Sequence, residues 1–228
     1  VPPSAIPKDI KTRVKQQQLR FRMATVLYIN IEGFGRIARD SGSDRVIDEL
    51  DQIILDFDKI VKKHNLQKIK TIGDAYMAAG GVPIRNITNP VDVVLAALEM
   101  QAYLQDVKAE YLEKGRTFWD MKIGIHTGAV TATIHGKKRL SYDLKGDTVN
   151  IATRIASSTE SGKIDISIMT YELVKDYFSC EYDGKIPVKY TGDMEVYRLK
   201  RLKRAFSKDR KQGIYPNSIF STKYKLRQ

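Results

Sequence analysis

The chain has 228 residues, of which 42% are hydrophobic and 29% charged, and a single cysteine, Cys180. These proportions exclude an intrinsically disordered chain, and one cysteine excludes both an internal disulfide framework and a cysteine-rich zinc site. No apolar run reaches the ~18 residues of a membrane span. Because the chain has a single cysteine, we expect a reducing, cytoplasmic setting, as in the cytoplasmic part of a membrane-bound protein. Because the chain opens with Val1 rather than Met, we also expect a fragment of a longer protein.

The net charge of +12 is concentrated at the two ends of the chain. Residues 1–22 carry +5 and residues 201–228 carry +8, so the body between them is nearly neutral. A nucleic-acid-binding domain carries its basic face on the folded body, so we expect no nucleic-acid partner. Basic ends are typical of solvated linkers, or of segments that touch acidic partners or a membrane surface.

Alternating strand and helix patterns predict an α+β sandwich. Residues 24–31 are rich in β-branched and aromatic residues, which favours a buried strand, and the apolar residues of 46–64 recur at helical spacing. In chain order the predicted elements are helix 8–18, strand 24–31, helix 46–64, strands 67–72 and 75–79, helix 93–111, strands 122–125 and 130–134, helix 146–156, strand 163–167, helix 170–177 with Thr170 as its cap, and strands 180–183, 188–190 and 196–199.

Three segments carry polar residues that can perform chemistry. Asp74 follows Gly73 at a predicted hairpin tip, where its carboxylate can face a ligand, although an ordinary turn aspartate is the alternative. Gly33 ends the first strand in a turn whose N–H groups can cradle phosphate. Asn150 and Arg154 lie four residues apart on one helix face, which suits an anionic, oxygen-rich ligand; a solvated helix face is the alternative.

Together these segments resemble the class III nucleotidyl cyclase catalytic domain, the adenylyl and guanylyl cyclase family. The resemblance extends from about residue 24 to 199 and rests on motifs at 70–77 (KTIGDAYM), 123–128 (IGIHTG), 146–154 (GDTVNIATR) and 192–199 (GDMEVYRL). It implies a ferredoxin-like βααββαβ sandwich of the α+β class over 23–200, preceded by a linker or transducing element (1–22) and followed by a basic tail (201–228).

The resemblance also implies an adenylyl cyclase that acts as a homodimer, with active sites at the interface and an upstream sensor or membrane domain. The substrate is ATP, and two Mg²⁺ or Mn²⁺ ions are held at each site. The implied residues are Lys70 and Asp143 for adenine recognition, Asn150 and Arg154 for the transition state, Gly33, Phe34 and Gly35 for phosphate, and Asp74, Asn30 and Ile31 for metal.

The sequence departs from the family pattern at three positions. Asn30 stands where the family has its first metal aspartate, Thr191 where a phosphate-binding lysine is common, and Gly35 where threonine is usual. An amide brings no charge to a cation, so we expect Asn30 to impair turnover. Asn30 and Thr191 favour a first alternative, a catalytically dead pseudo-cyclase that binds nucleotide and regulates a partner through its dimer surface. A second, a nucleic-acid-binding module built on 201–228, is disfavoured by the neutral body.

Overall fold

The computed structural model describes residues 17–33, 39, 43–69, 75–136, 140–189, 192–209 and 211–225. Its helices are α3 (Ser43–Lys63), α4 (Asn89–Glu113), α5 (Asp147–Ser158), α6 (Ile168–Val174), α7 (Ser218–Lys225) and the short 3₁₀ helix η2 (Arg204–Phe206). Its strands are β1 (Gln17–Glu32), β2 (Gln67–Ile69), β3 (Ala75–Gly80), β4 (Asp120–His135), β5 (Ser141–Lys145), β6 (Ile164–Ser167), β7 (Phe178–Val188) and β8 (Gly192–Leu202).

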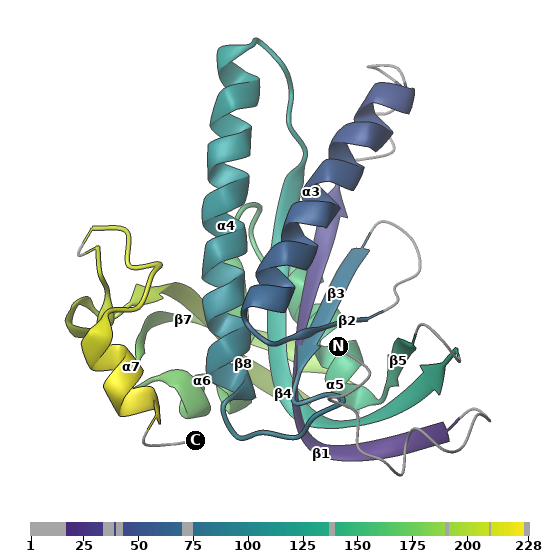
Figure 1. Cartoon of the computed structure of the whole chain (residues 1–228), viewed down its shortest axis with the longest axis vertical. Coiled ribbons are helices and arrows are strands. Elements are labelled where there is room, and N and C mark those ends of the chain that lie inside the picture. Colours follow the sequence, from purple (N-terminus) through teal and green to yellow (C-terminus); the bar gives the residue numbers. More distant parts are fainter. Residues whose placement is uncertain are drawn as a thin grey trace.

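These strands form one sheet with the order β2-β3-β1-β4-β6-β8-β7, and β5 pairs with β4 outside that path. β1 and β4 lie at its centre and pair antiparallel along most of their length. β4 pairs parallel with β6. The long helices α3 and α4 cover one face of the sheet (Figure 1). This arrangement confirms the predicted α+β sandwich.

The two faces of β1 are buried under different helices, because side chains alternate along a strand. Leu27 and Ile29 are fully buried in the hydrophobic cluster to which α3 and α4 contribute. Val26 is buried in a second cluster, which includes Ala152 of α5. Burial on both faces explains why residues 24–31 are apolar almost without interruption.

Several element predictions are wrong in detail. β1 begins at Gln17, so Gln17 and Gln18 belong to a strand rather than to the end of the predicted helix, whose residues 8–16 lie outside the described part of the chain. The strands predicted at 122–125 and 130–134 are the single strand β4. β5 was not predicted, and residues 204–206 and 218–225 of the expected tail are helical.

The cap of α6 also differs from the prediction. Ser167, not Thr170, is the capping residue, and its Oγ accepts a hydrogen bond from the backbone N–H of Thr170 at 3.3 Å. Serine at this position satisfies one of the free N–H groups of the first helical turn. The helix therefore begins at Ile168, two residues earlier than the sequence pattern indicates.

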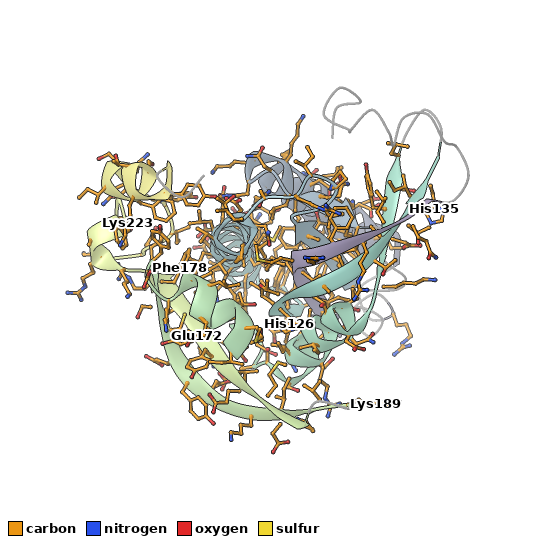
Figure 2. All side chains as sticks on the ribbon, turned by 90° about the horizontal axis from the view of Figure 1, so that it is seen from below. His126, His135, Glu172, Phe178, Lys189 and Lys223 are labelled. Atoms are coloured by element: carbon orange, nitrogen blue, oxygen red, sulfur yellow. The ribbon has the colours of Figure 1, made fainter. Side chains whose placement is uncertain are left out.

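A buried chain of hydrogen bonds runs from β4 through β6, α6 and β1 to the start of α4. It begins at His126, which lies inside the molecule (Figure 2), with its Nδ1 2.7 Å from Ser167 Oγ. The members, in order, are His126, Ser167, Thr170, Thr127, Thr25 and Asn89. Burial lowers the pKa of His126 to about 4, so the ring is neutral near pH 7.

Stability is therefore expected to fall as the pH drops from about 6.5 to about 4. In that window the unfolded chain binds a proton at His126 and the folded chain does not, so the free energy of unfolding decreases, by up to ~3 kcal/mol for this one group. Above about pH 6.5 the group has no further effect. Urea unfolding on both sides of the window should show a smaller pH difference for His126→Asn than for the unmodified chain.

The matched control is His135→Asn, because the His135 side chain is 35% exposed. This variant should retain the full pH difference in unfolding free energy. An undiminished difference in His126→Asn would show that other groups, and not the buried imidazole, cause the acid sensitivity.

Candidate active site

Helix α5 is held unusually close to β4. A Cβ atom built on Gly124 would lie 2.3 Å from the backbone nitrogen of Ala156 and 2.5 Å from the carbonyl oxygen of Ala152, so only glycine fits there. At the N-terminal end of α5, Thr148 Oγ1 donates a hydrogen bond of 2.7 Å to the carbonyl of Ala129. These contacts fix the position of α5 relative to the sheet at both ends of the helix.

The outward face of α5 lines a pocket of about 510 Å³. Asn150 and Arg154, the pair predicted from i,i+4 spacing, both line it and are exposed. The opposite wall is the end of β7 and the residue after it, Lys189. The lining residues are Asp147, Asn150, Ile151, Arg154, Pro187, Val188 and Lys189.

The apolar side of α5 anchors this face. Ile151 and Ile155 are buried in a small cluster with Ile186 of β7 and Val196 of β8. The polar pair Asn150 and Arg154 thus lies on the same helix as a packed apolar face. The pocket brings together a guanidinium, an ammonium and a carboxamide, a donor set that suits phosphate oxygens.

Lys189 lies two positions before Thr191 in the sequence. Whether it faces α5 depends on where β7 ends, and strand alternation alone leaves that open. The register of β7 against β8 runs to Val188, paired with Gly192, and Lys189 follows immediately. Its place in the pocket lining is therefore a result of the tertiary packing of α5 on β7.

Asp143, predicted to read the base, lies on the unpredicted strand β5. Its Cα partner across β4 is Thr133, and its carboxylate is 42% exposed, so it is open to a ligand. His135 Nε2 lies 3.6 Å from Asp143 Oδ2, a contact that the sequence did not indicate. β2, which ends at Ile69, the residue before Lys70, packs against β5. The structure thus brings the segment before Lys70 close to the strand of Asp143.

Asn30 lies near the end of β1 and is not among the residues that line the pocket. Its Cα partners are Ala75 of β3 and Lys122 of β4, and it is half-buried. Ala75 directly follows Asp74 in the sequence. Ile31 is 7% exposed and carries no polar side-chain atom, so only its backbone carbonyl can contact a cation. Gly33 follows with a φ of 75°, in the left-handed region that favours glycine.

Glu32 does not supply the carboxylate that Asn30 lacks. It lies two residues along the same strand, but its Oε1 is 2.7 Å from Lys122 Nζ and its Oε2 accepts a hydrogen bond of 3.0 Å from Ser161 Oγ. The hydrogen bond with Lys122 lowers the pKa of Glu32, so the carboxylate is ionised and already paired.

The remaining candidate residues include possible cation ligands, and some of them lie outside the described part of the chain. Among the residues that the structure describes, no group of three His, Cys, Asp or Glu side chains is arranged to hold a cation. His64 is hydrogen-bonded to Glu99 at 2.8 Å and is far along the chain from His126 and His135. The positions outside the described part are Phe34, Gly35, Lys70, Asp74 and Thr191.

Comparison with known proteins matches this arrangement to one family. The family model for the adenylate and guanylate cyclase catalytic domain matches residues 16–201. Human guanylyl cyclase C is 33% identical over 205 residues, which are 88% of this chain and 19% of that protein. An adenylate cyclase of Mycobacterium tuberculosis is 31% identical over 218 residues, 93% of this chain and 48% of that protein.

A solved structure supports the same assignment. The adenylyl cyclase CyaB from P. aeruginosa superposes with a TM-score of 0.74 at 27% identity, covering 82% of this chain and 98% of that one. The chain belongs to the adenylate and guanylate cyclase catalytic domain family, which confirms the resemblance read from the motifs. It spans a fifth to a half of the length of the two full-length relatives named above. None of the helices described is both long and apolar enough to cross a membrane.

Proposed function

We propose that this domain is an adenylyl cyclase that converts ATP to cyclic AMP and pyrophosphate. The observation that carries the proposal is the pocket on α5, where Asn150 and Arg154 face Lys189. The relatives include both adenylate and guanylate cyclases, so the choice of base rests on Lys70 and Asp143. Lysine can donate to N1 of adenine and aspartate can accept from its 6-amino group, whereas guanine presents the opposite pattern.

Asn150 and Arg154 have separate roles in the reaction. The ribose 3′-oxygen forms a bond to the α-phosphorus, the bond from that phosphorus to the oxygen bridging it to the β-phosphate breaks, and the 3′-hydroxyl proton leaves to solvent. Asn150 orients the ribose so that the 3′-oxygen is in line with the leaving pyrophosphate. Arg154 offsets the negative charge that develops on the phosphate oxygens.

We assign Lys189 the phosphate contact that Thr191 cannot make. Lys189 lines the same pocket as Arg154, from the opposite wall. A lysine ammonium on a flexible stem binds phosphate as a point charge, so a shift of two positions in the sequence is tolerable where a bidentate arginine would not be. The departure at Thr191 therefore leaves the cationic character of the pocket intact.

The residues present fit a hard divalent cation only in part. Asn30 offers a neutral amide oxygen and Ile31 a carbonyl, both donor types that Mg²⁺ and Mn²⁺ accept, while Asp74 is the one carboxylate of the implied set. A bound cation would neutralise phosphate charge and favour ionisation of the 3′-hydroxyl. With Asn30 in place of an aspartate, we expect slow turnover and better activity with Mn²⁺ than with Mg²⁺.

The absence of Asn30 and Gly33 from the lining of the α5 pocket supports a site shared by two chains. Asn30 and Gly33 lie at the end of β1 and do not line the pocket of Asn150 and Arg154. A site that uses both groups is complete when the β1 end of one copy meets α5 of another. Specific activity is therefore expected to rise with protein concentration.

Nucleotide choice is the direct test of the proposed substrate. ATP is expected to bind at least about tenfold more tightly than GTP in a calorimetric titration with Mn²⁺, since the pair of base contacts is matched to adenine. Asp143→Ala should reduce the preference, and His135→Ala, which removes only the neighbour of Asp143, should keep it. Equal affinities for the two nucleotides would refute the adenine assignment.

Mixing two inactive variants tests the shared site. Asp74→Ala and Arg154→Ala chains should each be inactive alone, yet a mixture should regain activity, because each heterodimer contains one site with both residues intact. Cyclic AMP production is measured for each chain and for the mixture. Absence of rescue, with heterodimers verified by a tag pull-down, would contradict a two-chain site.

The alternative function is that of a pseudo-cyclase, which binds nucleotide and regulates a partner through its dimer surface. Asn30 is the observation that favours it, because the described neighbour Glu32 cannot replace the missing charge. A chain that binds ATP but makes no cyclic AMP even after Asn30→Asp would support this alternative.

A further inference from the structure

The region after residue 201 lies outside the part of the chain that the family model matches. We call the described residues 202–209 and 211–225 the C-terminal lobe. It consists of η2, a connecting segment and α7, and packs beside α4 and α6 (Figure 1). The family model therefore does not account for the lobe.

The lobe is a folded unit rather than a solvated tail. Phe206 and Phe220 are buried, and their rings pack against Tyr177 with centroid separations of 5.5 and 5.1 Å. Asn217 Nδ2 donates a hydrogen bond of 2.8 Å to the carbonyl of Ala205, which ties α7 to η2. The Tyr224 hydroxyl donates a hydrogen bond to Asp92 of α4. The lobe therefore holds its charged residues at fixed positions on the surface.

The lobe carries exposed cations that have no carboxylate partner within the described residues. They are Lys203, Arg204, Lys208, Lys211 and Lys223. On the body, some exposed lysines pair with an acid, as Lys59, Lys108 and Lys175 do, whereas others, such as Lys114 and Lys163, have no ion pair among the described residues. The one acid of the lobe, Asp209, accepts a hydrogen bond of 2.7 Å from the backbone of Lys211 and shapes a turn.

The lobe also exposes two large apolar side chains. Ile219 on α7 is 60% exposed and Tyr215 is 43% exposed. Lys63 of α3 lies over the Tyr215 ring, 5.3 Å from its centroid, so that face of the ring is not open for stacking on a base. A nucleic acid would need such a stacking surface or a groove that follows its backbone. A lobe that combines exposed cations with an exposed isoleucine suits an anionic bilayer instead.

We propose that the C-terminal lobe docks the domain onto a membrane surface rich in anionic phospholipid. The cations attract the headgroups, and Ile219 enters the boundary between headgroups and acyl chains. Figure 2 shows Lys223 of the lobe and Lys189 of the pocket on opposite sides of that view, so a bilayer that contacts the lobe at Lys223 need not cover Lys189. The proposal does not depend on which nucleotide the pocket binds.

Vesicle flotation tests the proposal with the full chain. The chain should float with vesicles of about 30% phosphatidylserine in phosphatidylcholine, not with pure phosphatidylcholine, and binding should weaken strongly from ~0.1 to ~0.5 M NaCl. Replacing Arg204, Lys208 and Lys211 by glutamate should lower the partition coefficient at least about tenfold. Ile219→Ser should lower the partition coefficient that remains at ~0.5 M NaCl.

The matched control reverses one arginine and two lysines on the body, Arg22, Lys114 and Lys163, all exposed and without an ion pair among the described residues. This variant has the same net charge and should bind vesicles nearly as well as the unmodified chain. Thermal unfolding confirms that all variants are folded. Equal loss in both triple variants, no preference for phosphatidylserine, or tighter binding to single-stranded RNA than to vesicles at equal salt would each overturn the proposal.

Discussion

Replacing Asn30 by aspartate is expected to raise turnover by ~10²-fold or more while changing ATP affinity much less. The position lies at the end of β1 with Ala75 as its partner, and the nearby carboxylate of Glu32 is already paired with Lys122. A new carboxylate would therefore add charge that Glu32 does not supply. Because ATP brings its own phosphate charge to the cation, the gain falls mainly on the transition state.

Two measurements separate this effect from a general gain in negative charge. Mn²⁺ binding, followed by electron paramagnetic resonance in the absence of nucleotide, should tighten in Asn30→Asp. Asn65→Asp, the same chemical change on an exposed residue after α3, should alter neither Mn²⁺ binding nor turnover. If Asn30→Asp leaves both unchanged, position 30 is not a metal ligand and another step limits the rate.

Loss of Arg154 is expected to lower kcat by about 10²–10³-fold with a smaller change in KM. Arg154 is exposed on α5 and lines the pocket, so its removal opens no cavity in the core. The guanidinium interacts with negative charge that appears as the bond to pyrophosphate breaks. Its loss therefore lowers kcat more than it changes KM. The measurement is best made in an Asn30→Asp background, where the starting rate is higher.

Lys189 provides the comparison for Arg154. Lys189→Ala should mainly raise KM for ATP, since a phosphate contact that is present in both ground and transition states contributes to binding. Lys185 is an exposed lysine on β7, the strand that ends just before Lys189, and does not line the pocket. Lys185→Ala should therefore leave both kcat and KM unchanged. A kcat effect of Lys189→Ala as large as that of Arg154→Ala would place the lysine on the transition state as well.

The long elements were predictable because their periodicity is strong. The helix predicted over 46–64 and observed as α3 carries a regular apolar face, and the buried run at 24–31 identifies the centre of β1. The two strands predicted at 122–125 and 130–134 leave a gap that contains Gly128, a residue type that disfavours strands. In the structure a Cβ at Gly128 would lie 2.5 Å from Thr148 Oγ1, so the glycine allows contact with α5 within an unbroken strand.

The candidate site was predictable where one helix carries it. Asn150 and Arg154 share a face of α5 because of the helical repeat alone. The contact of His135 with Asp143 depends instead on the register of β5 against β4, and the pocket position of Lys189 depends on how α5 packs on β7. Such relations link segments that are distant in the chain, and no local pattern encodes them.

The packing of α5 against Gly124 sets a limit on how this domain can be varied. The helix that carries Asn150 and Arg154 meets the sheet backbone to backbone, without a side chain that can adjust. Any added carbon at position 124 must displace the whole helix and carry both functional groups with it. Variation aimed at a different nucleotide should therefore be directed at Asp143 on the half-exposed strand β5, while residue 124 is kept invariant in any library.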